Sequence, residues 1–209
     1  MGGITVTASA WSIDKTIGVP FASHGTASSL NLQKAKLVEY QGGGLGVTDK
    51  YENGSAPYHT VDNVGAYDFI MLSFSQPVQL LFGALTPFSV NGAADNDSWV
   101  SFSDVAPGST SLTDPKVFAN MILHATEVQG NLNGNQGYVS YLNPGMNTGY
   151  SWIVGADAFD GRAQNDGFKL AAFNVQLPVP EPATWASMIL GLGMIGAALR
   201  RRSGAAVLA

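Results

Sequence analysis

The chain of 209 residues contains no cysteine, and only 12% of its residues are charged. Without cysteine the protein can form no disulfide, no thiolate nucleophile and no cysteine-ligated metal site. Lysine and arginine together number 10 against 15 acidic residues, which gives a net charge of −5. Because nucleic-acid binding requires a basic face, we expect no nucleic-acid partner. A domain without disulfides must depend on its hydrophobic core or on bound ions.

Long amphipathic helical patterns are also missing before residue 180. Short runs rich in Val, Ile, Phe, Tyr and Trp are separated by Gly, Asn, Asp and Pro clusters, as is typical of strands joined by turns. These runs predict a mainly β, antiparallel β-sandwich (jelly-roll-like) ectodomain over residues 1–176. The predicted strands are 4–11, 37–40, 69–74, 78–85, 98–102, 117–124, 137–142, 150–154 and 167–175.

Three details of this prediction bear on the fold. Residues 69–74 are apolar on both faces, which indicates a central, covered strand. The polar and glycine-rich stretch 42–63 is predicted to be a loop. Asp114-Pro115 could begin a helix, so 117–124 has a short helix as its alternative to a strand.

A predominantly apolar run without a charged residue lies near the C-terminus, from Ala183 to Leu199. As a helix it would be about 26 Å long, at the short end of what crosses a bilayer core of ~30 Å. Arg200, Arg201 and Arg202 follow at once, and positive charge beside a membrane segment stays on the cytoplasmic side. We therefore predict a Pro-rich linker over 177–182, one transmembrane helix over 183–199 and a basic cytoplasmic tail over 200–209.

A Pro-Glu-Pro motif, a nearby tryptophan, an apolar segment and an arginine cluster occur in this order in the tail. Together they resemble a PEP-CTERM protein-sorting domain, in the subtype that continues as Ala-Thr-Trp-Ala. The resemblance implies that exosortase, a membrane cysteine protease or transpeptidase, cuts near this motif. It implies recognition through Pro180, Glu181, Pro182 and Trp185, and a stop-transfer role for Arg200, Arg201 and Arg202.

The same resemblance implies a location. The protein would be exported, anchored transiently in the inner membrane by its C-terminal helix, and found at the cell surface or outside the cell after cleavage. Such proteins typically accompany exopolysaccharide and biofilm systems, so an extracellular polysaccharide is an expected partner. Residues 1–6 have neither a basic start nor a long apolar run. Since export requires a leader, we expect a start upstream of Met1, or a leader that this sequence lacks.

Acidic and amide side chains gather in and beside the predicted loop 42–63. They are Asp49, Glu52, Asp62, Asn63 and Asp68. Calcium takes several carboxylate and carbonyl oxygens from flexible loops, which makes these residues candidates for a structural calcium site. Asp and Asn are also ordinary turn residues, and turn chemistry explains the same pattern.

Three functions stay open for residues 1–176. A non-enzymatic surface or matrix protein is favoured, because the sequence has no Gly-x-Ser-x-Gly elbow and no specific pair of catalytic carboxylates. A carbohydrate-binding module is the first alternative, with Tyr51 and Tyr58 of the polar loop as candidates for stacking on sugars. A secreted glycan hydrolase is the second alternative.

Overall fold

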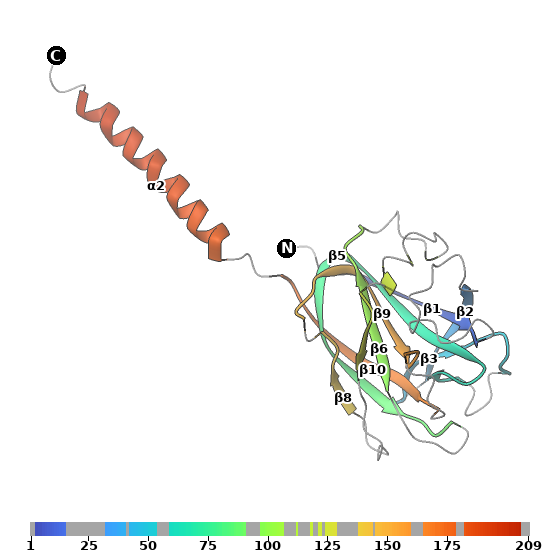
Figure 1. The fold of residues 1–209 in the computed structure, drawn as a ribbon. Helices are drawn as coiled ribbons and strands as arrows, with labels where there is room; N and C mark the ends of the chain where they lie inside the picture. Colours follow the sequence, from blue (N-terminus) through green and yellow to red (C-terminus); the bar gives the residue numbers. More distant parts are fainter. Residues whose placement is uncertain are drawn as a thin grey trace. The chain divides into compact units, whose positions relative to one another are not determined.

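The computed structural model describes residues 3–15, 32–40, 42–53, 59–90, 97–106, 112, 118, 121–122, 124–128, 138–143, 145–159, 165–178 and 182–205. The chain divides into two compact units, Met1–Leu177 and Pro178–Ala209. The described part of the first unit consists mainly of strands, and that of the second contains the helix α2, Pro182–Ala205 (Figure 1).

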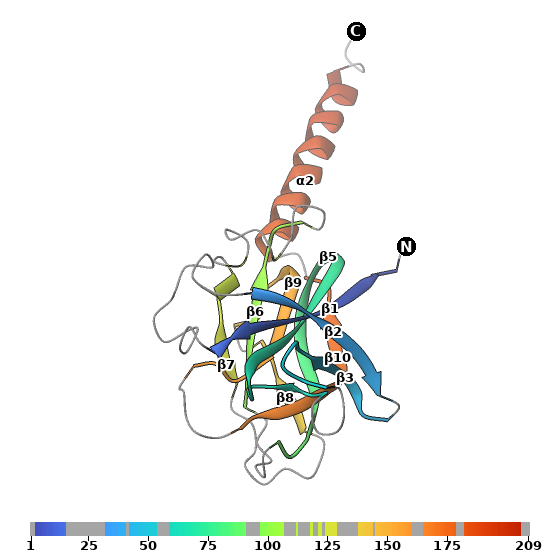
Figure 2. The ribbon, with the colours of Figure 1, turned by 90° about the vertical axis from the view of Figure 1, so that its right-hand side faces the viewer.

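The strands of the first unit form one antiparallel sheet (Figures 1 and 2). Their order in the sheet is β4-β10-β3-β2-β1-β5-β9-β6-β7, and β8 pairs with β5. In chain order they are β1 (Val6–Asp14), β2 (Leu32–Tyr40), β3 (Gly44–Thr48), β4 (Val61–Asp62), β5 (Ala66–Pro87), β6 (Ser98–Ser103), β7 (Thr126–Val128), β8 (Tyr138–Tyr141), β9 (Gly149–Ala156) and β10 (Gly167–Gln176).

The strand β5 closes this sheet on itself. Its first half pairs with β1 and β9, and its second half pairs with β10 and β8. Because β1 pairs with β2, β2 with β3 and β3 with β10, the chain of pairings returns to β5 and forms a closed barrel. The predicted β-sandwich is therefore wrong in its architecture. A sandwich packs two sheets face to face, whereas here β5, in the middle of a single sheet, also pairs with β10 near one end of the same sheet.

The reason for this difference lies in the middle of β5. The sequence predicts two strands, 69–74 and 78–85, separated by Ser75-Gln76-Pro77, but the structure has one strand of 22 residues. Pro77 lies where the register between β5 and β9 shifts, between Ser73 and Val78. Proline is tolerated at such irregularities of a ladder. The strand therefore continues past Pro77 and pairs with two different sets of neighbours.

Both faces of the first half of β5 are covered. Ile70, Leu72 and Phe74 belong to one buried cluster, together with residues of β9 and β10. Phe69 and Met71 belong to a second cluster on the opposite face, as the period of two along a strand requires. The prediction of a central, covered strand is confirmed.

Residues 117–124 differ from the predicted strand. Phe118, Met121 and Ile122 have helical backbone, and all three side chains are buried in the second cluster. Their spacing of three and four residues places them on one face of a helix. The helical alternative at this position is therefore the correct one for the described residues.

The predicted loop 42–63 contains two strands, β3 and β4. Two glycines of β3 allow neighbouring backbone to approach this strand closely. Gly44 has φ +98°, and a Cβ on it would come within 2.5 Å of the carbonyl oxygen of Leu170 on β10. A Cβ on Gly46 would overlap the carbonyl oxygen of His59. The glycines of β3 thus mark a strand that neighbouring backbone approaches closely.

The C-terminal helix α2 has 24 residues and begins at Pro182, where proline is well accommodated. Across the described part of the chain, we find no helix with the length and apolar character needed to cross a membrane. The predicted transmembrane helix over 183–199 is thus present as a helix but is not confirmed as a membrane span.

The glycine packing in β3 generates a stability prediction. We expect Gly44→Ala to lower the free energy of unfolding by about 3 kcal/mol, because it adds both a steric overlap and a left-handed backbone penalty. Gly43→Ala is the control, since its Cβ would meet the flexible Lys169 side chain at 3.3 Å. Urea unfolding measures both variants. Equal unfolding midpoints for the two variants would contradict the close approach of β3 and β10.

Candidate functional site

Three acidic side chains from separate elements converge inside the first unit. Asp62 lies in β4, Asp68 lies in β5, and Glu52 lies in the turn after β3. Each offers a carboxylate oxygen, and these oxygens all lie within 4.8 Å of one another. Asp62 and Asp68 are 0% and 1% exposed, and Glu52 is partly buried. We call these three residues the acidic cluster.

Strand geometry explains why carboxylates are buried at this place. Asp68 precedes Ile70, Leu72 and Phe74 in the same alternating row of β5, whose later members belong to the hydrophobic core. Asp62 is positioned by the pairing of β4 with β10, in which it lies opposite Gly167. The acidic cluster therefore lies next to the hydrophobic core, at buried positions that apolar residues usually occupy.

Hydrogen bonds hold two members of the cluster in place. The Thr60 hydroxyl donates to Asp62 Oδ2 at 2.7 Å, and the backbone N–H of Val64 donates to Asp62 Oδ1 at 2.9 Å. The backbone N–H of Asp49 donates to Glu52 Oε2 at 3.1 Å. By contrast, Glu52 Oε1 and Asp68 Oδ1 are buried without a hydrogen-bond partner among the described residues. A buried acceptor left in this state is costly.

The remaining two sequence candidates have different surroundings. Asp49 lies beside the cluster, where its Oδ1 accepts the backbone N–H of Tyr51 at 2.7 Å. Its Oδ2 is also buried without a hydrogen-bond partner among the described residues. Asn63 is engaged elsewhere, because its side-chain amide donates to Asp166 Oδ2 at 2.6 Å and its Oδ1 accepts the backbone N–H of Asp166. Asn63 therefore joins β4 to the segment before β10.

The ionisation of these carboxyl groups is strongly perturbed. Burial, reinforced by the charge of Asp62, raises the pKa of Glu52 to about 8. Burial raises the pKa of Asp62 to about 6, although the Thr60 and Val64 hydrogen bonds act in the opposite direction. The pKa of Asp68 is raised well above its usual range by burial and by the charges of its acidic neighbours. Burial also raises the pKa of Asp49.

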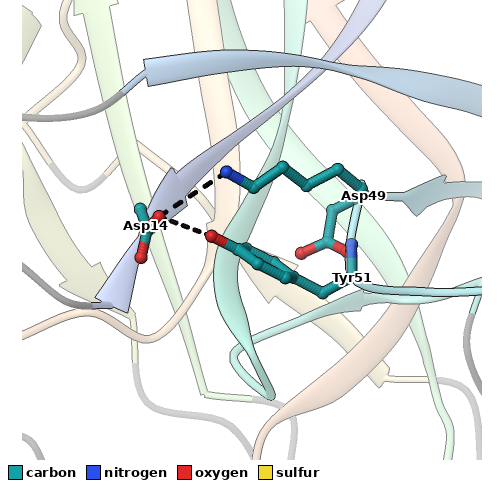
Figure 3. A network of polar contacts seen from close by, with 4 residues as sticks. Asp14, Asp49 and Tyr51 are labelled. Atoms are coloured by element: carbon teal, nitrogen blue, oxygen red, sulfur yellow. Dashed lines mark hydrogen bonds and ion pairs between the residues drawn. The ribbon is translucent and has the colours of Figure 1, made fainter.

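A separate polar network lies between β1 and the turn after β3 (Figure 3). The Tyr51 hydroxyl donates to Asp14 Oδ2 at 2.5 Å, and the Lys50 ammonium lies 3.7 Å from the same oxygen. Lys50 Nζ also lies 4.5 Å from the centroid of the Tyr51 ring. Tyr51, a candidate for stacking on sugars, is 54% exposed, but its hydroxyl and ring have these intramolecular partners. Tyr58, the second candidate, lies outside the described residues.

The predicted sorting residues lie in and before α2. Pro180 and Glu181 are outside the described residues, and Pro182 is the first residue of the helix. Trp185 lies in the first turn and is 50% exposed. The run Arg200 to Arg202 lies in the last turns of α2.

Residues 178–202 match the family model of the PEP-CTERM protein-sorting motif. The chain carries a PEP-CTERM sorting motif. This motif implies an exported protein that exosortase processes, with a C-terminal membrane-anchoring sorting signal that is later cleaved. No curated protein and no solved structure matches the chain. The PEP-CTERM match lies entirely within the second unit, Pro178–Ala209.

The sequence alone does not reveal the residues that support the acidic cluster. Thr60 and Val64 hold Asp62, and Tyr51 with Asp14 ties the turn that carries Glu52 to β1. The spacing Thr60-x-Asp62-x-Val64 is a signal for a local turn in which aspartate accepts a backbone N–H two residues on. No local signal exists for the contact between Tyr51 and Asp14, which are 37 residues apart.

The raised pKa values generate a prediction about pH. In a metal chelator, we expect the protein to lose stability as the pH rises from 5 to 8. Carboxyls with a raised pKa in the folded state hold protons that the unfolded chain releases, so their contribution is complete below pH ~4 and is lost as pH passes the folded pKa. For Asp62 and Glu52 these values are about 6 and about 8. Urea midpoints at pH 5, 6.5 and 8 measure the loss.

Glu52→Gln supplies the control for this prediction. Glutamine has no proton to lose, so the decline between pH 6.5 and 8 should flatten in this variant. An equal decline in Glu52→Gln and in the unchanged protein would show that other groups are responsible.

Proposed function

We propose that the barrel is a non-enzymatic surface or matrix domain, which the PEP-CTERM tail delivers out of the cell. The observation that carries this proposal is the match of residues 178–202 to the sorting motif. The motif accounts for export and for processing by exosortase. The role of the processed barrel as a surface or matrix domain is the part that we propose.

The division of the chain supports release of an intact domain. The first unit ends at Leu177, and its last strand, β10, ends at Gln176. The Pro-Glu-Pro motif at residues 180–182 follows both ends. A cut near the motif would therefore leave every described strand of the barrel on one side, with its hydrogen bonds and core unbroken.

The helix α2 fits a sorting signal that interacts with an apolar environment. Its large apolar side chains are exposed and lie on all sides of the helix. They are Trp185, Met188, Ile189, Leu190, Leu192, Met194, Ile195 and Leu199. A helix that is apolar all round requires apolar surroundings, which is consistent with the membrane-anchoring role that the motif implies.

The burial of the acidic cluster supports a domain without catalytic activity. Among the described residues, this cluster is the group of three or more acidic or histidine side chains that lie close enough to share a ligand, and two of its members are buried. Glycoside hydrolysis needs two carboxyl groups that flank a bound sugar, and buried groups cannot do so. Association with an extracellular polysaccharide is part of the proposal and rests on the resemblance of the tail alone.

The sorting role can be tested by substitution in the motif. In cells that contain exosortase, we expect Glu181→Gln and Trp185→Ala to leave the protein uncleaved and membrane-associated, because both residues belong to the recognition motif. Immunoblots of membrane and extracellular fractions measure cleavage through the change in mass. Ser187→Ala, in the same helix as Trp185 but not one of the predicted recognition residues, is the control and should be processed normally. Normal release of both motif variants would refute the sorting role.

A further inference from the structure

The acidic cluster brings more negative charge into the interior than nearby groups neutralise. Asp62 interacts electrostatically with Lys15, but the Lys15 ammonium also lies over the Tyr67 ring, 5.0 Å from its centroid. Lys50, the other lysine near this turn, pairs with Asp14 and also interacts electrostatically with Asp49. Among the described residues, Lys15 is thus the lysine that acts on the cluster itself, through Asp62. Charges buried with so little compensation are costly in a protein interior.

We propose that Glu52, Asp62 and Asp68 bind one calcium ion in the barrel, with the carboxylate of Asp49 beside it. This inference goes beyond the sorting function and is independent of exosortase. Three observations carry it: the carboxylate oxygens within 4.8 Å of one another, the burial of Asp62 and Asp68, and the unpartnered oxygens Glu52 Oε1 and Asp68 Oδ1.

A cation accounts for the unpartnered oxygens better than protonation does. A protonated carboxyl group is itself a donor and needs an acceptor in line. Protons on Glu52 and Asp68 would remove two charges, but they would add two O–H donors that need acceptors, and Glu52 Oε1 and Asp68 Oδ1 have no hydrogen-bond partner among the described residues. A divalent ion attracts all three carboxylates at once, and it supplies a partner for Glu52 Oε1 and Asp68 Oδ1 together.

The ligand chemistry favours calcium among the common divalent ions. The cluster offers only carboxylate oxygens, whereas zinc sites are built mainly from nitrogen and sulfur ligands. Calcium lies about 2.4 Å from its oxygens, so oxygens within 4.8 Å of one another are close enough to share one calcium ion. Magnesium demands a stricter octahedron and keeps several waters. A partly buried site made by a turn and two strands suits calcium.

The proposed ion would join three elements of the barrel. They are the turn after β3, the two-residue strand β4 and the start of β5. Extracellular calcium modules have dissociation constants of about 10⁻⁴–10⁻³ M. A site of that class stays unfilled at the low calcium level of the cytosol and fills outside, so the exported domain would reach full stability after export.

The test uses the full chain in detergent, stripped with EDTA and then titrated with CaCl2. We expect one calcium ion per chain by isothermal titration calorimetry. The Tm should rise by roughly 5–10 °C once free calcium is about 100-fold above Kd. MgCl2 at the same concentration should give a clearly smaller rise. No calcium response, or an equal response to magnesium, would overturn the assignment.

Two variants locate the site. Glu52→Gln and Asp68→Asn should each weaken calcium binding at least tenfold and lose most of the Tm shift. Both should be as stable as the unchanged protein in EDTA, because each removes charge repulsion. Glu39→Gln is the matched control, since it makes the same chemical change at an exposed position of β2 and should bind calcium normally. If Asp68→Asn does not fold, Glu52→Gln decides alone, and unchanged binding in Glu52→Gln would overturn the proposal.

Discussion

The two-way pairing of β5 is the constraint on which the rest of the first unit depends. One strand of 22 residues pairs with β1 and β9 near its start and with β10 and β8 near its end. This pairing requires β5 to continue through Pro77, at the place where its register with β9 shifts. Closure follows from it, and closure removes two free edges that would otherwise invite pairing with other chains.

Closure also decides where the buried charges lie. Asp68 sits near the start of β5, and Asp62 sits on β4, which is held by β10. Because β10 also pairs with β3 and with β5, the turn after β3 that carries Glu52 comes to the same place. The glycines of β3 permit this approach, since Gly44 and Gly46 leave no room for a Cβ. The pairing of strands in the barrel therefore brings the three carboxylates together, and no short sequence motif does so.

The two units of the chain differ in where they place their apolar side chains. The barrel buries its apolar residues in two clusters on opposite faces of β5 and places carboxylates at the margin of the interior. The helix α2 instead exposes its large apolar side chains and carries arginines in its last turns. The PEP-CTERM motif lies within the second unit, so the signal that directs the protein and the domain that is directed can be separated by one cut.

The sequence by itself determined the tail and the identity of most strands. A sorting motif is read as a linear string, so Pro180 to Pro182, Trp185 and the arginines identify it without any tertiary contact. Short runs rich in Val, Ile, Phe, Tyr and Trp between turn residues likewise marked β1, β6, β9 and β10. The gathering of acidic and amide side chains in and beside 42–63 indicated calcium candidates, but residue type and spacing do not separate Glu52 and Asp68 from Asn63.

Only the tertiary structure decided that the strands close into a barrel and that three of the five candidates converge. Local alternation records which side of a strand is buried, but it does not record which strands pair or where a register shifts. In the sequence, Pro77 and the glycines of β3 indicated that strands end there. In the sheet, neighbouring strands accommodate these residues, so the strands continue through them. Charge burial at Asp62 and Asp68 followed from that closure, because the interior of a barrel exists only once its last strand is paired.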